Sequence, residues 1–229
     1  MSDLTRMVES SELLSGDGVH PPDVAATLIY GLGDGCENVL VVTGPRSRAR
    51  YHPASAPGAC LRLRIRPGHA RRLLGVPLTE LADRPVLATD LWGRAAGRLI
   101  DDVAALAGTR RPGPPTRPTA LDAALGELAA GRPVGAAADR LGVGERQLRN
   151  VFAQEVGLSP KQVARVVRLR RVLGHRGRDW ATVADEAGFF DQAHLISDFR
   201  SLMGVSPGRY AAGRLPSPAP CAMSMRSAV

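Results

Sequence analysis

The sequence has little lysine, few cysteines and no long apolar run. Lys161 is its only lysine, so arginine supplies 29 of the 30 basic residues. Its three cysteines, Cys36, Cys60 and Cys221, are too few and too widely spaced for a disulfide framework or a zinc knuckle, which favours a reducing compartment. No apolar run approaches the roughly 20 residues that a membrane helix needs, and the first residues lack the basic region and apolar run of a signal peptide. We therefore expect a cytoplasmic protein with no membrane partner.

Motifs of catalysis are missing as well. The sequence contains no nucleophile elbow, no phosphate-binding loop and no grouping of Ser, His and Asp suited to nucleophilic catalysis. His20, His52 and His69 lack the paired spacing of metal ligands, so we expect core or solvated histidines there. The sequence thus predicts a protein that is not an enzyme and that needs no cofactor and no metal.

What the sequence does have is an uneven excess of positive charge. The formal net charge is +8 and the sequence pI is about 10.5. Residues 1–114 carry 14 basic and 12 acidic side chains, whereas residues 115–215 carry 15 basic and 10 acidic ones. An excess concentrated in one half of the chain favours a polyanionic partner for that half.

The segment 132–207 contains the same pattern twice, which indicates an internal duplication of a small helical unit. The three repeated blocks keep the same order in both copies, with offsets of 46, 47 and 47 residues: Ala138-Asp139-x-x-Gly142 with Ala184-Asp185-x-x-Gly188, Leu148-x-x-x-Phe152 with Leu195-x-x-x-Phe199, and Gly157-Leu158-Ser159-Pro160 with Gly204-Val205-Ser206-Pro207. One extra residue near Phe189–Phe190 accounts for the change of offset.

Each copy predicts two short helices joined by a glycine-containing turn, which is the helix-turn-helix arrangement. Apolar periodicity after residue 119 predicts seven helices in all, over 120–130, 134–141, 145–155, 160–174, 179–187, 192–203 and 207–212. The repeated Leu and Phe of each second helix are four residues apart, so they share one face and are expected in the core of the unit. The opposite face is left for another role.

That opposite face is the part of each second helix that could read DNA bases, because Arg pairs well with guanine and Asn or Gln with adenine in the major groove. The candidate base-reading residues are Arg146, Gln147, Arg149 and Asn150 in the first unit, and Gln192, Ala193, His194 and Ser197 in the second. An ordinary solvated helix face is the alternative. Two such faces in tandem, within the basic half of the chain, favour DNA.

Between the two units, residues 161–178 carry seven basic and no acidic side chains. We interpret this stretch as a rigid helical spacer whose arginines meet phosphates, a contact that adds salt-dependent affinity without reading sequence. The candidate phosphate contacts are Lys161, Arg165, Arg168 and Arg200. A rigid spacer lets two reading helices enter successive major grooves, roughly 34 Å apart.

Residues 119–213 resemble the DNA-binding domain of AraC/XylS-type bacterial transcription regulators. The match lies in the repeated blocks above and in two longer runs of the second unit, Val183-Ala-Asp-Glu-Ala-Gly-Phe189 and Phe190-Asp191-Gln192-Ala-His194-Leu-Ile-x-x-Phe199-Arg200. The resemblance implies seven helices, two helix-turn-helix units with a linking helix, promoter DNA as partner and contact with RNA polymerase. One departure is Glu145 at the start of the first reading helix, where a carboxylate suits the helix dipole but faces DNA phosphates unfavourably.

The N-terminal part is expected to be a small β domain followed by helices. Short apolar runs predict strands over 26–30, 38–43 and 46–52, and a helix is expected from residue 89 to 106, whereas residues 1–20 are expected to form a loose arm. The run Leu61–Arg66 alternates strictly between apolar residues and arginine. Its arginines, at 62, 64 and 66, form either a solvated sheet face or an anion-binding wall inside a ligand cavity.

This part more weakly resembles the cupin-like sensor or dimerisation domain of the same family, through the 61–68 strand and turn, Leu73-Leu-Gly-Val-Pro77 and Asp90-Leu-Trp-Gly93. That resemblance implies a small-molecule effector or a homodimer, while Tyr30, Tyr51 and Trp92 are expected in the core. The complete prediction is an α+β protein with a cupin-like N-terminal β domain at 1–107, a proline-rich linker at 108–118, an all-α seven-helix double helix-turn-helix domain at 119–213 and a disordered tail at 214–229.

Two other functions compete with sequence-specific regulation. A non-specific architectural DNA-binding protein would share the basic helices but bind any duplex similarly. A DNA-repair methyl acceptor, which is fused to some related DNA-binding domains, would need a reactive cysteine in a dedicated motif. The surroundings of Cys36 and Cys60 do not resemble one.

Overall fold

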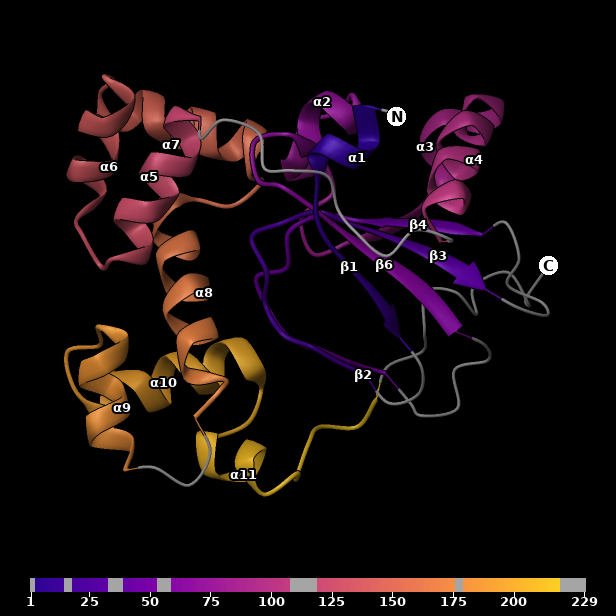
Figure 1. Cartoon of the computed structure of the whole chain (residues 1–229). Coiled ribbons are helices and arrows are strands. Elements are labelled where there is room, and N and C mark those ends of the chain that lie inside the picture. The colour runs from indigo at the N-terminus through magenta and orange to yellow at the C-terminus, as the bar shows by residue number, and fades with distance from the viewer. Residues whose placement is uncertain are drawn as a thin grey trace.

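A β-sheet at the N-terminus is followed by two small groups of helices that a single helix connects (Figure 1). The computed structural model describes residues 3–14, 18–32, 39–52, 59–107, 119–175 and 179–218. The predicted linker at 108–118 and residues 219–229 of the predicted tail lie outside these described residues. The architecture is α+β, as the sequence predicts.

The main sheet has five strands in the order β1-β6-β3-β4-β7, and every pair is antiparallel. Its strands are β1 (Val8–Leu14), β3 (Thr27–Leu32), β4 (Leu40–Thr43), β6 (Ala59–Ile65) and β7 (Pro85–Leu87). A separate ribbon pairs β2 (Gly18–His20) with β5 (Arg50–His52). The predicted third strand over 46–52 is therefore shorter than expected and joins the ribbon, because Ser47 is held instead by hydrogen bonds to the carboxylate of Asp83.

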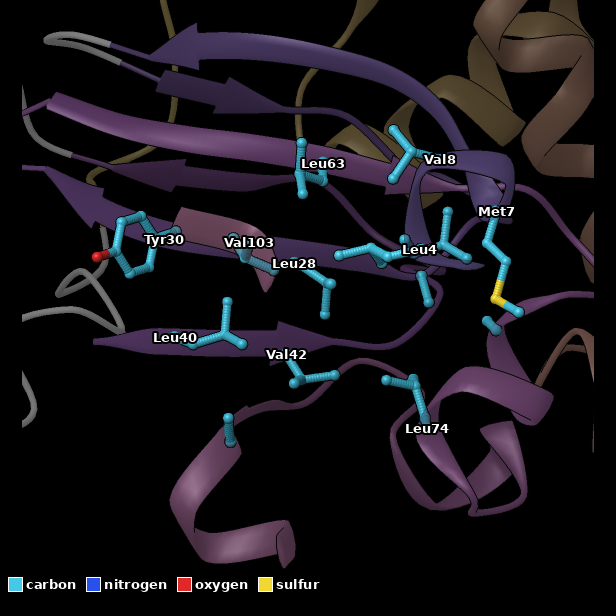
Figure 2. Close-up of a cluster of buried hydrophobic side chains, with 14 of the residues drawn as sticks. Leu4, Met7, Val8, Leu28, Tyr30, Leu40, Val42, Leu63, Leu74 and Val103 are labelled. Atoms are coloured by element: carbon cyan, nitrogen blue, oxygen red, sulfur yellow. The ribbon is translucent and has the colours of Figure 1, made fainter. Parts of the chain in front are cut away.

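One face of the main sheet carries the larger apolar core (Figure 2). The alternation in β6 places Leu61, Leu63 and Ile65 in this core, each at most 4% exposed. Leu28 and Tyr30 from β3 and Leu40 and Val42 from β4 enter the same core, which the short helices cover. Those helices are α1 (Asp3–Met7), α2 (Ala70–Leu74), η1 (Leu78–Glu80), α3 (Ala88–Trp92), η2 (Gly93–Ala95) and α4 (Ala96–Ala107).

The expectation of a loose arm over residues 1–20 is wrong. Leu4 and Met7 of α1 are buried in the sheet core, and β1 pairs with β6 along its length. The strand is hard to detect because it lies at the edge of the sheet, where Leu13 is exposed beside polar residues, so it lacks the apolar alternation of an inner strand.

The long helix expected over 89–106 is also interrupted. Gly93 ends α3 with a φ of 53°, and the helix resumes at α4 after the η2 turn. Glycine adopts this backbone region without the steric penalty that a side chain brings. The interruption lets Trp92 pack against the core and donate its indole N–H to the carbonyl oxygen of Leu74 at 3.1 Å.

The C-terminal part contains seven helices in the described residues, as the sequence predicts: α5 (Ala120–Ala129), α6 (Val134–Leu141), α7 (Glu145–Glu155), α8 (Pro160–Val172), α9 (Trp180–Ala187), α10 (Gln192–Met203) and α11 (Pro207–Ala211). In both units the turn after the first helix begins at a glycine of positive φ, Gly142 at 63° and Gly188 at 78°. This is the backbone conformation that the repeated glycines require.

The helix α8 belongs to both units and lies between them in Figure 1. Val163 and Val166 near its start are buried in the first core, and Leu169 and Val172 near its end are buried in the second. A capping box in which Ser159 and Gln162 exchange hydrogen bonds fixes its first turn. Because one continuous helix contributes to both cores, it fixes the relative placement of the two units.

Candidate nucleic-acid interface

The first candidate reading helix, α7, presents the polar face that the sequence predicts. Leu148 and Phe152 are fully buried, whereas the four candidate base-reading residues of this unit are all exposed: Arg146, Gln147, Arg149 and Asn150. The guanidinium of Arg149 lies 3.1 Å from the carboxylate of Glu145, one turn earlier, and both side chains are more than half exposed. Such an exposed pair contributes about 0.3–0.5 kcal/mol, so it orients Arg149 without holding it against a stronger anionic partner.

The second candidate reading helix, α10, begins with a firm cap. The Asp191 carboxylate accepts a hydrogen bond from the backbone N–H of His194 at 2.7 Å. The side chains of Gln192, Ala193 and Ser197 are exposed; Ala193 and Ser197 lie on the helix face opposite Leu195, whereas Gln192 is the first residue of the helix. The N-terminus of a helix carries partial positive charge, which suits an approach to the negatively charged DNA surface.

His194, the fourth candidate of this unit, is placed differently. Its ring packs edge-on against Phe189, with centroids 5.4 Å apart, and its Nε2 lies 3.8 Å from a carboxylate oxygen of Asp198. Its Nδ1 lies 3.4 Å from the backbone N–H of Phe190. The ring therefore supports the start of α10 rather than standing free on the exposed face.

Phe190 is a surface feature that the sequence-based reading did not select. Its side chain is 91% exposed, directly before the cap of α10, while the neighbouring Phe189 is 6% exposed and belongs to the core of the second unit. In the sequence the two phenylalanines are adjacent, and no pattern indicates which of them is exposed. A large apolar side chain that is almost fully exposed beside a candidate reading helix can mark a binding surface. Phe190 is therefore a further candidate contact with DNA.

The four candidate phosphate contacts fall into two pairs. Lys161 and Arg200 are exposed. Arg165 and Arg168 are instead directed at the carboxylate of Asp198, with nitrogen–oxygen distances of 2.9 and 3.8 Å, and Arg168 also lies over the ring of Phe189 at 5.3 Å. This second pair joins α8 to α10 and so sets the position of the second reading helix. Arg176 and Arg178, also counted in the basic spacer, lie outside the described residues.

The N-terminal part contacts both helical units and the helix between them. On the first unit, Arg71 pairs with Glu155 at 2.7 Å and the backbone of Gly157 lies against that of Leu78 in η1. On the second unit, the backbone N–H of Ala49 donates to the carbonyl oxygen of Leu202 at 2.8 Å. The position of each reading helix is thus tied to the β domain.

The hydroxyl of Tyr51 adds a second bond to the second unit, donating to the carbonyl oxygen of Met203 at 2.6 Å. Burial, together with the nearby Tyr210, raises the pKa of Tyr51 to about 12, which keeps the hydroxyl protonated as a donor. The expectation of Tyr51 in the core is confirmed, since it is 8% exposed.

A buried carboxylate ties α8 itself to the sheet. Asp23 is 4% exposed, and its two oxygens accept hydrogen bonds from Arg64 of β6 at 2.7 and 2.9 Å. Arg170 of α8 lies 3.1 Å from the same carboxylate. Burial opposes ionisation of Asp23, but the bonds and charge of Arg64 outweigh it and hold the pKa of Asp23 below its ordinary value.

The arginine face of β6 is not a solvated sheet face. The side chains of Arg62 and Arg64 are only 24% and 21% exposed, and they line a cavity of about 220 Å³ together with Arg46 and with Arg170 from α8. Glu12 pairs with Arg62, and Glu9 with Arg64. Of the two alternatives for this face, the solvated sheet face is therefore wrong. Its arginines form ion pairs and line a cavity beside α8, and such pairing is what makes burial of charged side chains possible.

His20, on the ribbon beside this cavity, makes stability depend on pH. Burial and the positive charges of Arg46, His52 and Arg62 lower the pKa of His20 to about 3. An unfolded histidine has a pKa of about 6.5, so between about pH 6.5 and pH 3 the unfolded chain holds a proton that the folded chain does not. We expect the free energy of unfolding to fall as the pH is lowered through this range. His20→Asn is expected to reduce the dependence of this free energy on pH by up to about 1.4 kcal/mol per pH unit. Urea unfolding of both proteins at pH 7, 6 and 5 measures the difference; parallel curves would contradict it.

Comparison with known proteins identifies the helical part. A family model described as a helix-turn-helix domain matches residues 137–213. This range begins inside α6 and ends just after α11. This segment is a helix-turn-helix domain. The matched residues lie inside the segment 119–213 in which the repeated blocks predict two helix-turn-helix units.

Several solved structures are similar to this chain. The C-terminal domain of AraT, a response regulator from Geobacillus stearothermophilus, is 21% identical, with 44% of this chain and 92% of that chain covered and a TM-score of 0.39. The DNA-binding domain of AdpA, solved in complex with a target DNA, is 26% identical, with 41% and 87% covered and a TM-score of 0.37. ToxT from Vibrio cholerae is 9% identical, with 89% and 97% covered and a TM-score of 0.43. No match is found among curated proteins.

None of the helices described is long and apolar enough to cross a membrane. No group of three or more His, Cys, Asp or Glu side chains that could hold a metal ion occurs in the part of the chain that the structure describes.

Proposed function

We propose that the chain is a sequence-specific regulator of transcription whose helices α7 and α10 read bases in adjacent major grooves of double-stranded DNA. The observation that carries this proposal is the pair of exposed polar faces on tandem units that share α8. Each face combines side chains suited to base edges, and a fully buried Leu and Phe of the same helix hold the helix in place. Within a helix-turn-helix domain, this arrangement supports base reading by both units.

The shared helix supports the spacing that adjacent grooves require. Its 13 residues extend over about 20 Å at 1.5 Å per residue, and the two units attach near its opposite ends. In Figure 1 α7 lies near one end of α8 and α10 near the other, which supports entry into two grooves roughly 34 Å apart along one face of the duplex. We place Lys161 and Arg200 at phosphates because both are exposed, and give Arg165 and Arg168 a second duty in fixing α10 through Asp198.

Selection of binding sites from fragmented genomic DNA tests the proposal. With the purified full chain at physiological salt, we expect a defined sequence to be enriched and to bind about a thousandfold or more tightly than bulk DNA. The architectural alternative predicts similar affinity for every duplex. Enrichment of no sequence would end the proposal in favour of that alternative.

Phe190 is proposed as an additional contact of the second unit. Its ring is exposed and touches no core, so Phe190→Ala is expected to change the free energy of unfolding by less than about 0.5 kcal/mol. We expect the same change to weaken binding of the selected DNA by about tenfold, because an aromatic ring contributes about 1–3 kcal/mol when it stacks or packs against a nucleotide. Fluorescence anisotropy with the selected duplex measures the effect. Unchanged affinity would remove Phe190 from the interface.

Control by a small effector is the part of the function assigned to the β domain. Contacts from that domain reach the first unit at Gly157, the second unit at Leu202 and Met203, and the shared helix at Arg170. A ligand that favours one arrangement of these contacts would change how the two reading helices are placed and hence the affinity for DNA. Pairing of two subunits and contact with RNA polymerase stay predictions from the family resemblance.

A further inference from the structure

We propose that the cavity between the sheet and α8 binds a small organic oxyanion, a carboxylate or a phosphate group, through Arg46, Arg62 and Arg170. This inference rests on the proposed function, because it names the chemical class of the effector that would act on the reading helices. It is carried by the composition of the cavity, by one buried arginine and by the elements that meet there.

The cavity has more positive than negative side chains. Four arginines and two carboxylates line it: Arg46, Arg62, Arg64 and Arg170, with Asp23 and Glu12. Both oxygens of Asp23 are already engaged, one by Arg64 and the backbone N–H of Ala25, the other by Arg64 and Arg170. Glu12 pairs with Arg62 at the edge of the sheet and is more than half exposed. The carboxylates present therefore leave positive charge in the cavity without a partner.

Arg46 is the arginine of this cavity that carries the positive charge without a close anionic partner among the described residues. It is 4% exposed, yet in the described part of the chain its side chain makes no ion pair within 4.0 Å. Its guanidinium makes only long contacts, 3.4 Å to the hydroxyl of Thr43 and 3.5 Å to the carbonyl oxygen of Pro21, and its Nε is without a hydrogen-bond partner. Burial of the charged group, only partly offset by Asp23, lowers the pKa of Arg46 to about 10.

A buried, poorly bonded guanidinium is costly unless an anion meets it. Desolvation of the charged guanidinium is unfavourable, and its planar fork of donors matches the two oxygens of a carboxylate or phosphate. Charge-assisted bonds to such a group are about twice as strong as those between neutral groups. Arg46 is thus placed and oriented for an oxyanion that the protein itself does not supply.

The size and position of the cavity limit what it can hold. A volume of about 220 Å³ admits a small metabolite rather than a chain of a polymer, and its lining is largely polar. Its wall includes strands β1, β3 and β6 and one residue of the shared helix, Arg170. An oxyanion bound here would share Arg170 with Asp23, and so would alter the contact that ties α8 to the sheet.

Thermal unfolding of the full chain without DNA tests this inference. The probes are inorganic phosphate and succinate, with the neutral diamide succinamide as control and sodium chloride added to hold ionic strength constant. At a hundredfold excess over the dissociation constant we expect the melting temperature to rise by roughly 5–10 °C with at least one oxyanion, and not with the diamide. A rise with succinate alone assigns a carboxylate, and a rise with phosphate alone assigns a phosphate ester. No rise with either probe at 10 mM overturns the inference.

Variants locate the site. Arg62→Gln is expected to weaken binding of the probe by about tenfold to a hundredfold, since it removes charged hydrogen-bond donors. Arg66→Gln is the matched control, because it removes the same charge directly after the end of the same strand, at a residue that does not line the cavity. Arg170→Gln, on α8, repeats the test with a side chain that is 39% exposed, should Arg62→Gln not fold. Equal losses in the Arg66 and cavity variants would show ordinary surface binding and would overturn the proposal.

The two proposals fail separately. Because the probes are tested without DNA, loss of the oxyanion response leaves sequence-selective DNA binding untouched. A chain that binds the probe through Arg62 and Arg170 but enriches no genomic sequence would retain the oxyanion site and lose the proposed function.

Discussion

Asp23→Ala is expected to lower the free energy of unfolding by about 3–5 kcal/mol. The substitution removes a carboxylate that both Arg64 and Arg170 contact and leaves these guanidiniums beside the buried Arg46. Removing one partner of a buried ion pair has this cost because the remaining charge stays desolvated without compensation. The loss of the hydrogen bond from the backbone of Ala25 adds to it.

Urea unfolding at pH 7 measures this effect, with Glu12→Ala as the control. Glu12 also pairs with an arginine of β6, but its side chain is 56% exposed, so its removal is expected to cost at most about 1 kcal/mol. A similar cost for the two variants would mean that Asp23 contributes no more than a surface ion pair. In that case the attachment of α8 to the sheet would have to depend on other contacts.

Gly157→Ala is expected to have the second large effect, a loss of about 2–5 kcal/mol. Gly157 has a φ of 78°, where an added Cβ costs roughly 1–2 kcal/mol by itself. That Cβ would also lie 2.5 Å from the carbonyl oxygen of Leu78, so η1 and the first helical unit would have to separate. The variant therefore tests whether the β domain is seated on the first unit.

The duplication supplies the control for this experiment. Gly204 is the equivalent residue of the second repeat, with a φ of 72°, and among the described residues a Cβ there would meet only a side-chain atom of Pro216, at 3.7 Å. Gly204→Ala is expected to show the backbone cost alone. If both variants lose the same stability in urea unfolding, the contact between Leu78 and Gly157 contributes nothing to the folded state.

The helical half could be predicted from sequence because local and global signals agree there. The repeated blocks place small residues, turn glycines and an i, i+4 pair at the positions where each unit needs them, and the structure has all seven helices. The side of α10 that faces outward followed from the same spacing, but the orientation of His194 did not. Its ring is held by Phe189 and Asp198, partners that no periodicity reveals.

The N-terminal half was harder to predict because its strands are short and its sheet pairings are distant in sequence. The strand β1 lies at an edge and pairs with residues about fifty positions away, so its polar pattern looked like an unstructured arm. The alternation in β6 correctly predicted a strand with an arginine face. Whether that face met water or a cavity depended on Arg170 and α8, more than a hundred residues further along the chain.

The contacts between the two halves were outside the reach of sequence reasoning altogether. Tyr51 was expected in the core, but its bond to Met203 joins residues 152 positions apart. Gly157 was recognised as a repeated turn residue, yet its close approach to Leu78 distinguishes it from Gly204. The two repeats therefore differ in the contacts that equivalent residues make with the rest of the protein, and the sequence of the repeats alone does not indicate these contacts.

The central claim is that α7 and α10 read bases while the exposed cations beside them meet phosphates. Competition binding of the selected duplex against bulk DNA, measured over a range of salt for Arg149→Ala, Gln192→Ala and Lys161→Ala, tests it most directly. We expect the first two variants to lose about tenfold to a hundredfold in preference for the selected duplex. We expect Lys161→Ala to weaken both duplexes alike and to reduce the salt slope by about 1. Equal losses on both duplexes from all three variants would contradict the assignment of the two reading helices.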